Sequence, residues 1–103
     1  MSKYIFIYSD NMGNREEMKT LLNSIPEITD WRYDLPNSFF IQSELNAKKL
    51  GGLIKRQKPD SRYFLTEINP SNRQGWLPTS TWDFLKKKQD APQKSPSDNS
   101  NLP

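Results

Sequence analysis

Two residue types with versatile chemistry are missing from this chain: it contains no cysteine and no histidine. Their absence excludes disulfide bonds, thiolate nucleophiles, catalysis by a histidine acid or base, and structural zinc sites built on these ligands. Any catalysis is left to carboxylates, lysine, tyrosine, hydroxyl groups or an oxygen-ligated metal such as Mg²⁺. A chain without cysteine also fits the reducing cytosol, so we expect a cytoplasmic protein.

A long apolar run is missing as well. The apolar stretch YIFIY at residues 4–8 is followed directly by Ser9 and Asp10. It is too short for the core of a signal peptide or for a membrane span. The sequence therefore predicts a protein with no membrane association.

Apolar residues become scarce after about residue 86. Residues 89–103 are rich in proline, serine, asparagine and aspartate, and such a segment cannot bury enough apolar surface to offset its chain entropy. We therefore predict one domain over residues 1–88 and a disordered C-terminal tail over residues 89–103.

Hydrophobic periodicity locates the expected secondary structure. Strands are expected where β-branched and aromatic residues run together or alternate with polar ones. Helices are expected where apolar residues recur at three- and four-residue spacing between capping residues. The expected strands cover residues 3–9, 27–35, 38–43 and 62–68, and the expected helices cover residues 14–25, 46–57 and 79–88.

This order of elements is the ferredoxin-like βαββαβ pattern with a short extra helix at its end. We predict an α+β fold with a four-stranded antiparallel sheet and two helices on one face. We expect the first and last strands in the middle of the sheet and the two hairpin strands outside. Two glycines in the second helix, Gly51 and Gly52, either weaken it or permit close packing against the sheet.

The face of the sheet opposite the two helices needs a cover, because the first strand is apolar almost throughout. A second copy of the chain would supply it, and so would the C-terminal helix. We expect a homodimer with Trp76 and Trp82 at the interface. The turn RQGWLP, residues 73–78, is alternatively expected to tuck Trp76 under the sheet.

The aspartate that follows the first strand is the candidate catalytic and metal-binding residue. Asp10 has the position of a carboxylate that could hold Mg²⁺ and activate a water for phosphodiester cleavage, particularly with a second copy across a dimer axis. The competing interpretation is a turn in which Asp10 only bonds to nearby backbone.

A basic helix face is the candidate nucleic-acid interface. Lysine and arginine exceed the acidic residues, giving a net charge of +3, which is compatible with an RNA or DNA partner. At helical spacing four cations share the outward side of the second helix: Lys48, Lys49, Lys55 and Arg56. These residues either contact phosphate groups or form an ordinary solvated face.

Four features together resemble a known group of proteins: Asp10 after the first strand, SFFIQSELNAKKL entering the second helix, NRQGWLP after the last strand, and TWDFLK in the final helix. The resemblance, over roughly residues 3–86, is to small bacterial ferredoxin-fold proteins. These look like the small CRISPR-associated ribonuclease-like family and the VapD-type and GhoS-type toxin–antitoxin nucleases. It implies a ferredoxin-like dimer, an acidic residue at Asp10, and Arg15 as the phosphate-binding arginine.

The sequence thus supports two hypotheses about function. The first is a cytosolic dimer that engages nucleic acid and, if catalytic, is a Mg²⁺-dependent endoribonuclease with Asp10 as metal ligand. The second is a non-enzymatic protein-interaction module, such as an antitoxin, an immunity protein or a regulator, whose aromatic surface and edge strands bind a partner protein.

Overall fold

The computed structural model describes residues 1–86, in which the elements follow the expected order. The strands are β1 (Ser2–Tyr8), β2 (Ile28–Arg32), β3 (Ser38–Ser43) and β4 (Tyr63–Glu67). The helices are α1 (Arg15–Asn23), α2 (Ala47–Gln57) and α3 (Thr79–Lys86), and a short 3₁₀ turn, η1, covers Asp10–Met12. The prediction of a disordered tail over residues 89–103 lies outside the described residues.

The four strands form one antiparallel sheet in the order β2-β3-β1-β4. The expected placement of the first and last strands in the middle is wrong, because β1 and β3 are central and β2 and β4 are the edges. The physical reason is that each βαβ unit is split, with a strand of the other unit lying between its two parallel strands. The connection through α1 carries the chain past the position of β3, and the connection through α2 carries it past β1.

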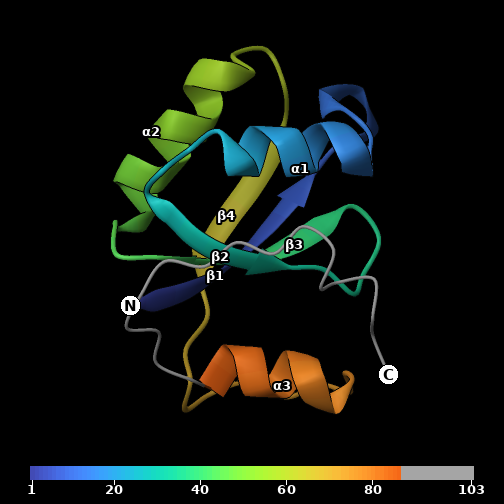
Figure 1. Ribbon diagram of the computed structural model, residues 1–103, viewed down its shortest axis with the longest axis vertical. Coiled ribbons are helices and arrows are strands. Elements are labelled where there is room, and N and C mark those ends of the chain that lie inside the picture. Colours follow the sequence, from blue (N-terminus) through green and yellow to red (C-terminus); the bar gives the residue numbers. More distant parts are fainter. Residues whose placement is uncertain (87–103) are drawn as a thin grey trace.

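Two helices cover one face of the sheet, as expected (Figure 1). The side chains that alternate toward α1 and α2 are almost fully buried. They include Tyr4 and Phe6 from β1, Trp31 from β2, and Phe39 and Ile41 from β3. This layer is the main hydrophobic core, and it fixes the directions in which the remaining side chains of β1 and β3 point.

Helix α1 begins with a capping box. The Asn14 side chain accepts a hydrogen bond from the Glu17 backbone at 2.9 Å, and the Glu17 carboxylate accepts one from the Asn14 backbone at 2.8 Å. The expected apolar stripe of this helix is buried. The stripe consists of Met18, Leu21, Leu22 and Ile25.

The two glycines of α2 do not serve close packing. A Cβ at Gly52 would meet no atom within 4 Å, and one at Gly51 would be 3.6 Å from the Tyr63 hydroxyl, an ordinary contact. The packing alternative is therefore wrong, and the glycines only lower the helix propensity of α2.

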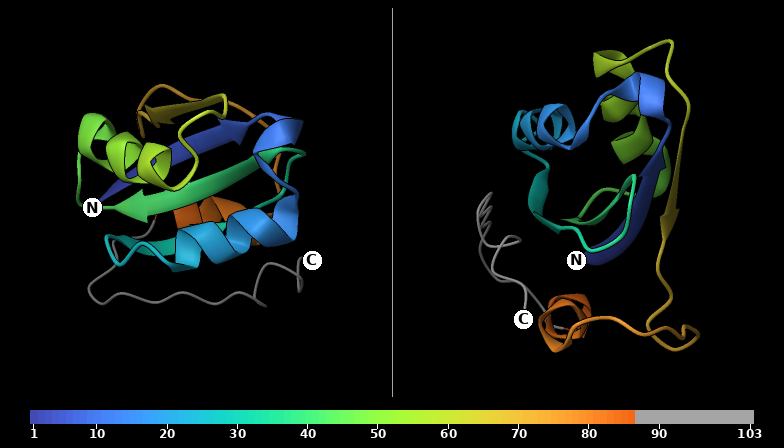
Figure 2. Two further views of the ribbon diagram at one scale, coloured as in Figure 1. Left: turned by 90° about the horizontal axis from the view of Figure 1, so that it is seen from above. Right: turned by 90° about the vertical axis from the view of Figure 1, so that its right-hand side faces the viewer.

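Helix α3 lies on the opposite face of the sheet from α1 and α2 (Figures 1 and 2). Phe84 and Leu85 pack with Phe40 of β3 in a second, smaller apolar cluster. The helix therefore covers part of the face that the sequence analysis expected to be covered either by a second copy of the chain or by this helix. Within residues 1–86 the structure has no helix both long and apolar enough to cross a membrane.

A buried polar network holds α3 to β2. The Arg32 guanidinium donates to Thr81 Oγ1 at 2.7 Å and to Ser80 Oγ at 2.6 Å. The Thr81 hydroxyl donates to the Asp34 carboxylate, which also forms an ion pair with Arg32 at 3.7 Å. The Arg32 and Asp34 side chains are only 9% and 4% exposed, so each charge depends on the other for compensation.

Candidate functional site

Asp10 stands in η1, directly after β1, and is exposed. The Asn37 side chain donates to Asp10 Oδ1 at 2.7 Å and to the Tyr8 carbonyl at 3.0 Å. Asn37 has φ 50°, the left-handed conformation that asparagine tolerates best after glycine. The Asp10 carboxylate therefore ties η1 to the loop before β3, and does not cap its own turn.

This contact bears on the two interpretations of Asp10. It gives the carboxylate a structural partner, while the exposed position leaves it accessible to an ion. Within residues 1–86 no group of three or more acidic side chains gathers there. Mg²⁺ at Asp10 would thus rely on water ligands, or on Asp10 of a second copy.

Arg15, expected to bind phosphate, is engaged within the fold. Its two terminal nitrogens donate to the Ser38 and Leu35 carbonyls, each at 3.1 Å. Its guanidinium lies 3.9 Å from the Tyr33 ring centroid and 5.4 Å from that of Phe39. Arg15 therefore anchors α1 to the β2–β3 loop through charge-assisted hydrogen bonds and cation–π contacts.

The four expected cations of α2 are all exposed, while Leu50 and Ile54 of the same helix are buried. The four are Lys48, Lys49, Lys55 and Arg56. In the part of the chain that the structure describes, none of them forms an ion pair with a carboxylate. They give α2 a basic outer face, as the sequence predicted.

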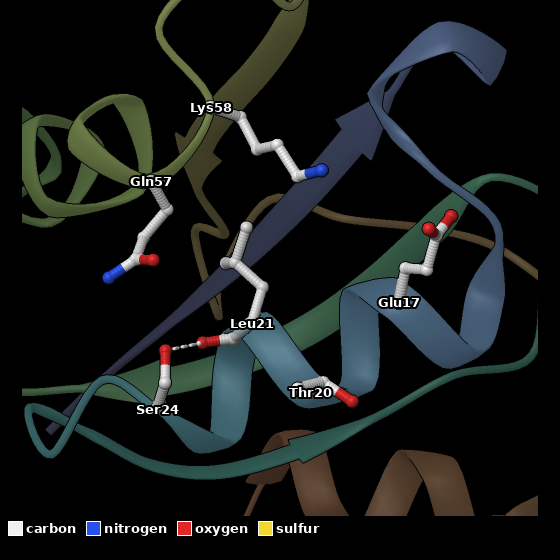
Figure 3. A pocket seen from close by; sticks show the side chains of 6 residues that line it. All are labelled: Glu17, Thr20, Leu21, Ser24, Gln57 and Lys58. Atoms are coloured by element: carbon white, nitrogen blue, oxygen red, sulfur yellow. Dashed lines mark hydrogen bonds between the residues drawn. The ribbon is translucent and has the colours of Figure 1, made fainter.

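A groove of about 350 Å³ runs between α1 and the end of α2 (Figure 3). Its lining residues are Glu17, Thr20, Leu21, Ser24, Gln57 and Lys58. Several of its polar groups already serve the helices: Glu17 caps α1, and the Ser24 hydroxyl donates to the Leu21 carbonyl at 2.6 Å. The groove is therefore the surface depression between two packed helices, and two of its polar side chains are already engaged in the fold.

The largest exposed apolar side chains apart from Met1 define what we call the apolar face: Ile7, Leu35, Phe64 and Trp76. Trp76 is 97% exposed, Phe64 is 61% exposed, and Ile7 and Leu35 are each 45% exposed. Ile7 of β1 lies opposite Phe64 of β4 in the sheet register. Leu35 and Trp76 border one groove of about 330 Å³, which also reaches Ile5 beside Ile7 on β1.

The expectation that Trp76 tucks under the sheet is wrong. Trp82 of α3 occupies that position instead, packed half-buried in the cluster of Phe40 and Leu85. Arg73 lies over the Trp82 ring at 5.4 Å. The segment before α3 packs against this cluster through Leu77 and leaves the neighbouring Trp76 indole in solvent. Trp76 and Trp82 border the same groove, one exposed and one packed.

The sequence reasoning did not identify two features of the second face: a polar network and the exposed Phe64. The Arg32–Thr81–Asp34 network joins positions far apart in the chain, and no local pattern marks it. Phe64 carried a usable signal: it lies between Tyr63 and Leu65, so an apolar side chain had to point to the second face.

Comparison of the chain with protein-family models, with curated proteins and with solved structures finds no match to any of them.

Proposed function

We propose that this protein is a non-enzymatic interaction module with a ferredoxin-like arrangement, and that it acts as a homodimer formed through the apolar face. The ferredoxin-like assignment is supported by the alternation β1-α1-β2-β3-α2-β4 and by central strands β1 and β3. The observation that carries the proposal is Trp76, a large aromatic side chain that is 97% exposed beside an apolar groove.

Burial of this indole would contribute strongly to association. A tryptophan buries about 150–250 Å² at an interface, which at about 25 cal/mol per Å² amounts to about 4–6 kcal/mol before the costs of association. Trp is also enriched among residues that dominate binding energy. An exposed apolar cluster of this kind is typical of a surface that binds another protein.

A second copy fits this surface because the groove and the indole lie next to each other. In an isologous dimer each copy offers the same patch, so each Trp76 would enter the groove of its partner. The groove of about 330 Å³ is bordered by Phe40 and Trp82, which would give the indole aromatic neighbours. Ile7 and Phe64 would extend the contact along β1 and β4.

The test is sedimentation velocity of the full chain over a range of concentrations. We expect a concentration-dependent dimer whose dissociation constant rises about thirtyfold or more in Trp76→Ala, because loss of a dominant interface residue costs about 2 kcal/mol or more. Phe64→Ala should weaken it as well. Gln57→Ala replaces an exposed residue of α2, on the face of the sheet opposite α3, and it should have no effect on the dimer. A chain that stays monomeric, or a dimer insensitive to both variants, would refute the proposal.

Nucleic-acid binding is the second candidate, supported by four exposed cations on α2 that have no acidic partner within residues 1–86. A mobility-shift assay with single- and double-stranded RNA and DNA tests it. Replacement of Lys48, Lys49, Lys55 and Arg56 by Gln should abolish binding. A mobility shift that persists in this variant would exclude the α2 face as the nucleic-acid binding site.

The endoribonuclease hypothesis adds a further expectation, namely cleavage that requires both Mg²⁺ and Asp10. The same nucleic acids are incubated with wild type and with Asp10→Ala, both with and without Mg²⁺. Cleavage lost in the variant but retained in Arg62→Gln would favour an enzyme over the interaction module. Absence of cleavage by a folded wild type would contradict the nuclease hypothesis.

A further inference from the structure

A second hollow lies where the start of β1, the segment after β4 and the end of α3 meet. It measures about 250 Å³. Among residues 1–86, three cationic side chains border it, Lys3, Arg73 and Lys86, together with one acidic residue, Glu67. We call it the basic pocket. It is separate from the basic face of α2, because Lys3 and α3 belong to the other side of the sheet.

Two of the three cations are positioned by aromatic rings. Lys3 is only 7% exposed, and its ammonium lies 5.5 Å from the centroid of the Phe84 ring. Arg73 is half-buried, with its guanidinium 5.4 Å from the Trp82 ring. Because these contacts restrict the side chains, less conformational entropy is lost when a ligand binds than with freely moving surface cations.

Glu67, the acidic residue that borders the basic pocket within residues 1–86, lies on the face of the sheet opposite to that of Lys3. Glu67 lies opposite Tyr4 in the sheet register, and paired residues of an antiparallel sheet share a face. Tyr4 faces the core under α1 and α2. Burial, and secondly the charge of Glu67, raise the pKa of Tyr4. Of the charged side chains in residues 1–86 that border the hollow, those on the α3 side are therefore all positive.

We propose that the basic pocket binds a phosphate group of a small anion. Arg73 would supply a planar fork of donors that fits phosphate oxygens, and Lys3 and Lys86 would supply point charges. Lys86 also offsets the partial negative charge of the α3 C-terminus, which alone would disfavour an anion. The pocket has room for inorganic phosphate or pyrophosphate. The site needs no second copy of the chain, and it adjoins the groove of the apolar face, which Arg73 also borders.

The test is a titration of the full chain with pyrophosphate, in which binding is measured by calorimetry and by changes in amide chemical shifts. We expect saturable binding with a single site per chain, and shifts centred on Lys3, Ile68 and Arg73. Binding should weaken as NaCl is added. Arg73→Gln and Lys86→Gln should each weaken it about tenfold or more, as expected for loss of a charge-assisted hydrogen bond.

Arg62→Gln is the matched control. It removes one exposed cation at the opposite end of β4, so it should leave pyrophosphate affinity within about twofold of wild type, since Arg62 lies beyond the reach of screened charges. A separate arm uses a single-stranded oligonucleotide, whose phosphates distinguish a nucleic-acid source from a free anion. Equal loss of affinity in Arg62→Gln and Arg73→Gln would overturn the proposal, as would binding of the oligonucleotide alone.

Discussion

Replacement of Arg15 tests whether this side chain serves the fold or a phosphate ligand. Arg15 donates to the Ser38 and Leu35 carbonyls and stacks on Tyr33. A hydrogen bond from a charged group contributes about 1.5–3 kcal/mol, and we take the lower value for both because the site is partly exposed. Two such bonds give about 3 kcal/mol, to which the cation–π contact adds about 0.5 kcal/mol. Arg15→Gln should therefore destabilise the protein by about 3–3.5 kcal/mol.

The assay is urea unfolding and thermal melting of wild type and variant. A loss of about 3 kcal/mol corresponds to a melting temperature lower by about 12 °C or more in a domain of this size. Lys19→Gln is the matched control on α1. Lys19 also approaches the Tyr33 ring, at 5.2 Å, but its hydrogen bond is to the exposed Glu16, so it should cost under about 0.5 kcal/mol. Stability of Arg15→Gln within about 0.5 kcal/mol of wild type would refute this account of Arg15.

Three further predictions concern α2, the α3 anchor and the buried tyrosines. Gly52→Ala should raise the free energy of unfolding by about 0.5–1 kcal/mol, since an added Cβ meets nothing within 4 Å; an unchanged or lower urea midpoint would contradict this. Arg32→Met should destabilise by about 3 kcal/mol or more, because it leaves the Asp34 carboxylate buried without its ion-pair partner; a double variant with Asp34→Asn should recover part of the loss in the same unfolding assay. Burial raises the pKa of Tyr4 and of Tyr63, whose hydroxyls donate to backbone carbonyls. The folded state therefore binds these protons more tightly, so the free energy of unfolding should stay constant below about pH 10 and fall as the pH rises further. The fall should be less steep in Tyr63→Phe. If the free energy of unfolding, measured by urea titration between about pH 9 and 11, falls equally steeply in wild type and variant, Tyr63 has no such role.

The main core was predictable because its signals are local. The strand at the start of the chain, the Asn14 cap and the stripe that includes Met18 and Leu22 follow from side-chain type and spacing alone. The same holds for the inward direction of Trp31 and for the exposed cations of α2. Period and capping residues decide these features within one element, so no long-range information is needed.

The features that failed depend on contacts between distant segments. The order of the strands follows from how the crossovers pass over the sheet, which residue periodicity does not encode. From the sequence alone, either Trp76 or Trp82 could pack against the second face of the sheet. The packing of α3 against Phe40 buries part of Trp82 and leaves Trp76 exposed. Arg15 was predictable as a basic residue near Asp10, but its partners, the Ser38 and Leu35 carbonyls, are more than 19 residues away in the chain.

The central claim is that a second copy covers Trp76, and the most direct measurement is the solvent accessibility of its indole. The indole signals of a ¹⁵N-labelled chain are recorded with a soluble paramagnetic agent at concentrations below and above the association midpoint, and the Trp76 signal is assigned by its loss in Trp76→Phe. The Trp31 indole, which donates to the Asn23 side chain at 2.9 Å, is the internal control. The account predicts that Trp76 is broadened in the dilute sample and protected in the concentrated one, while Trp31 is protected in both. A Trp76 signal broadened equally at all concentrations would contradict it.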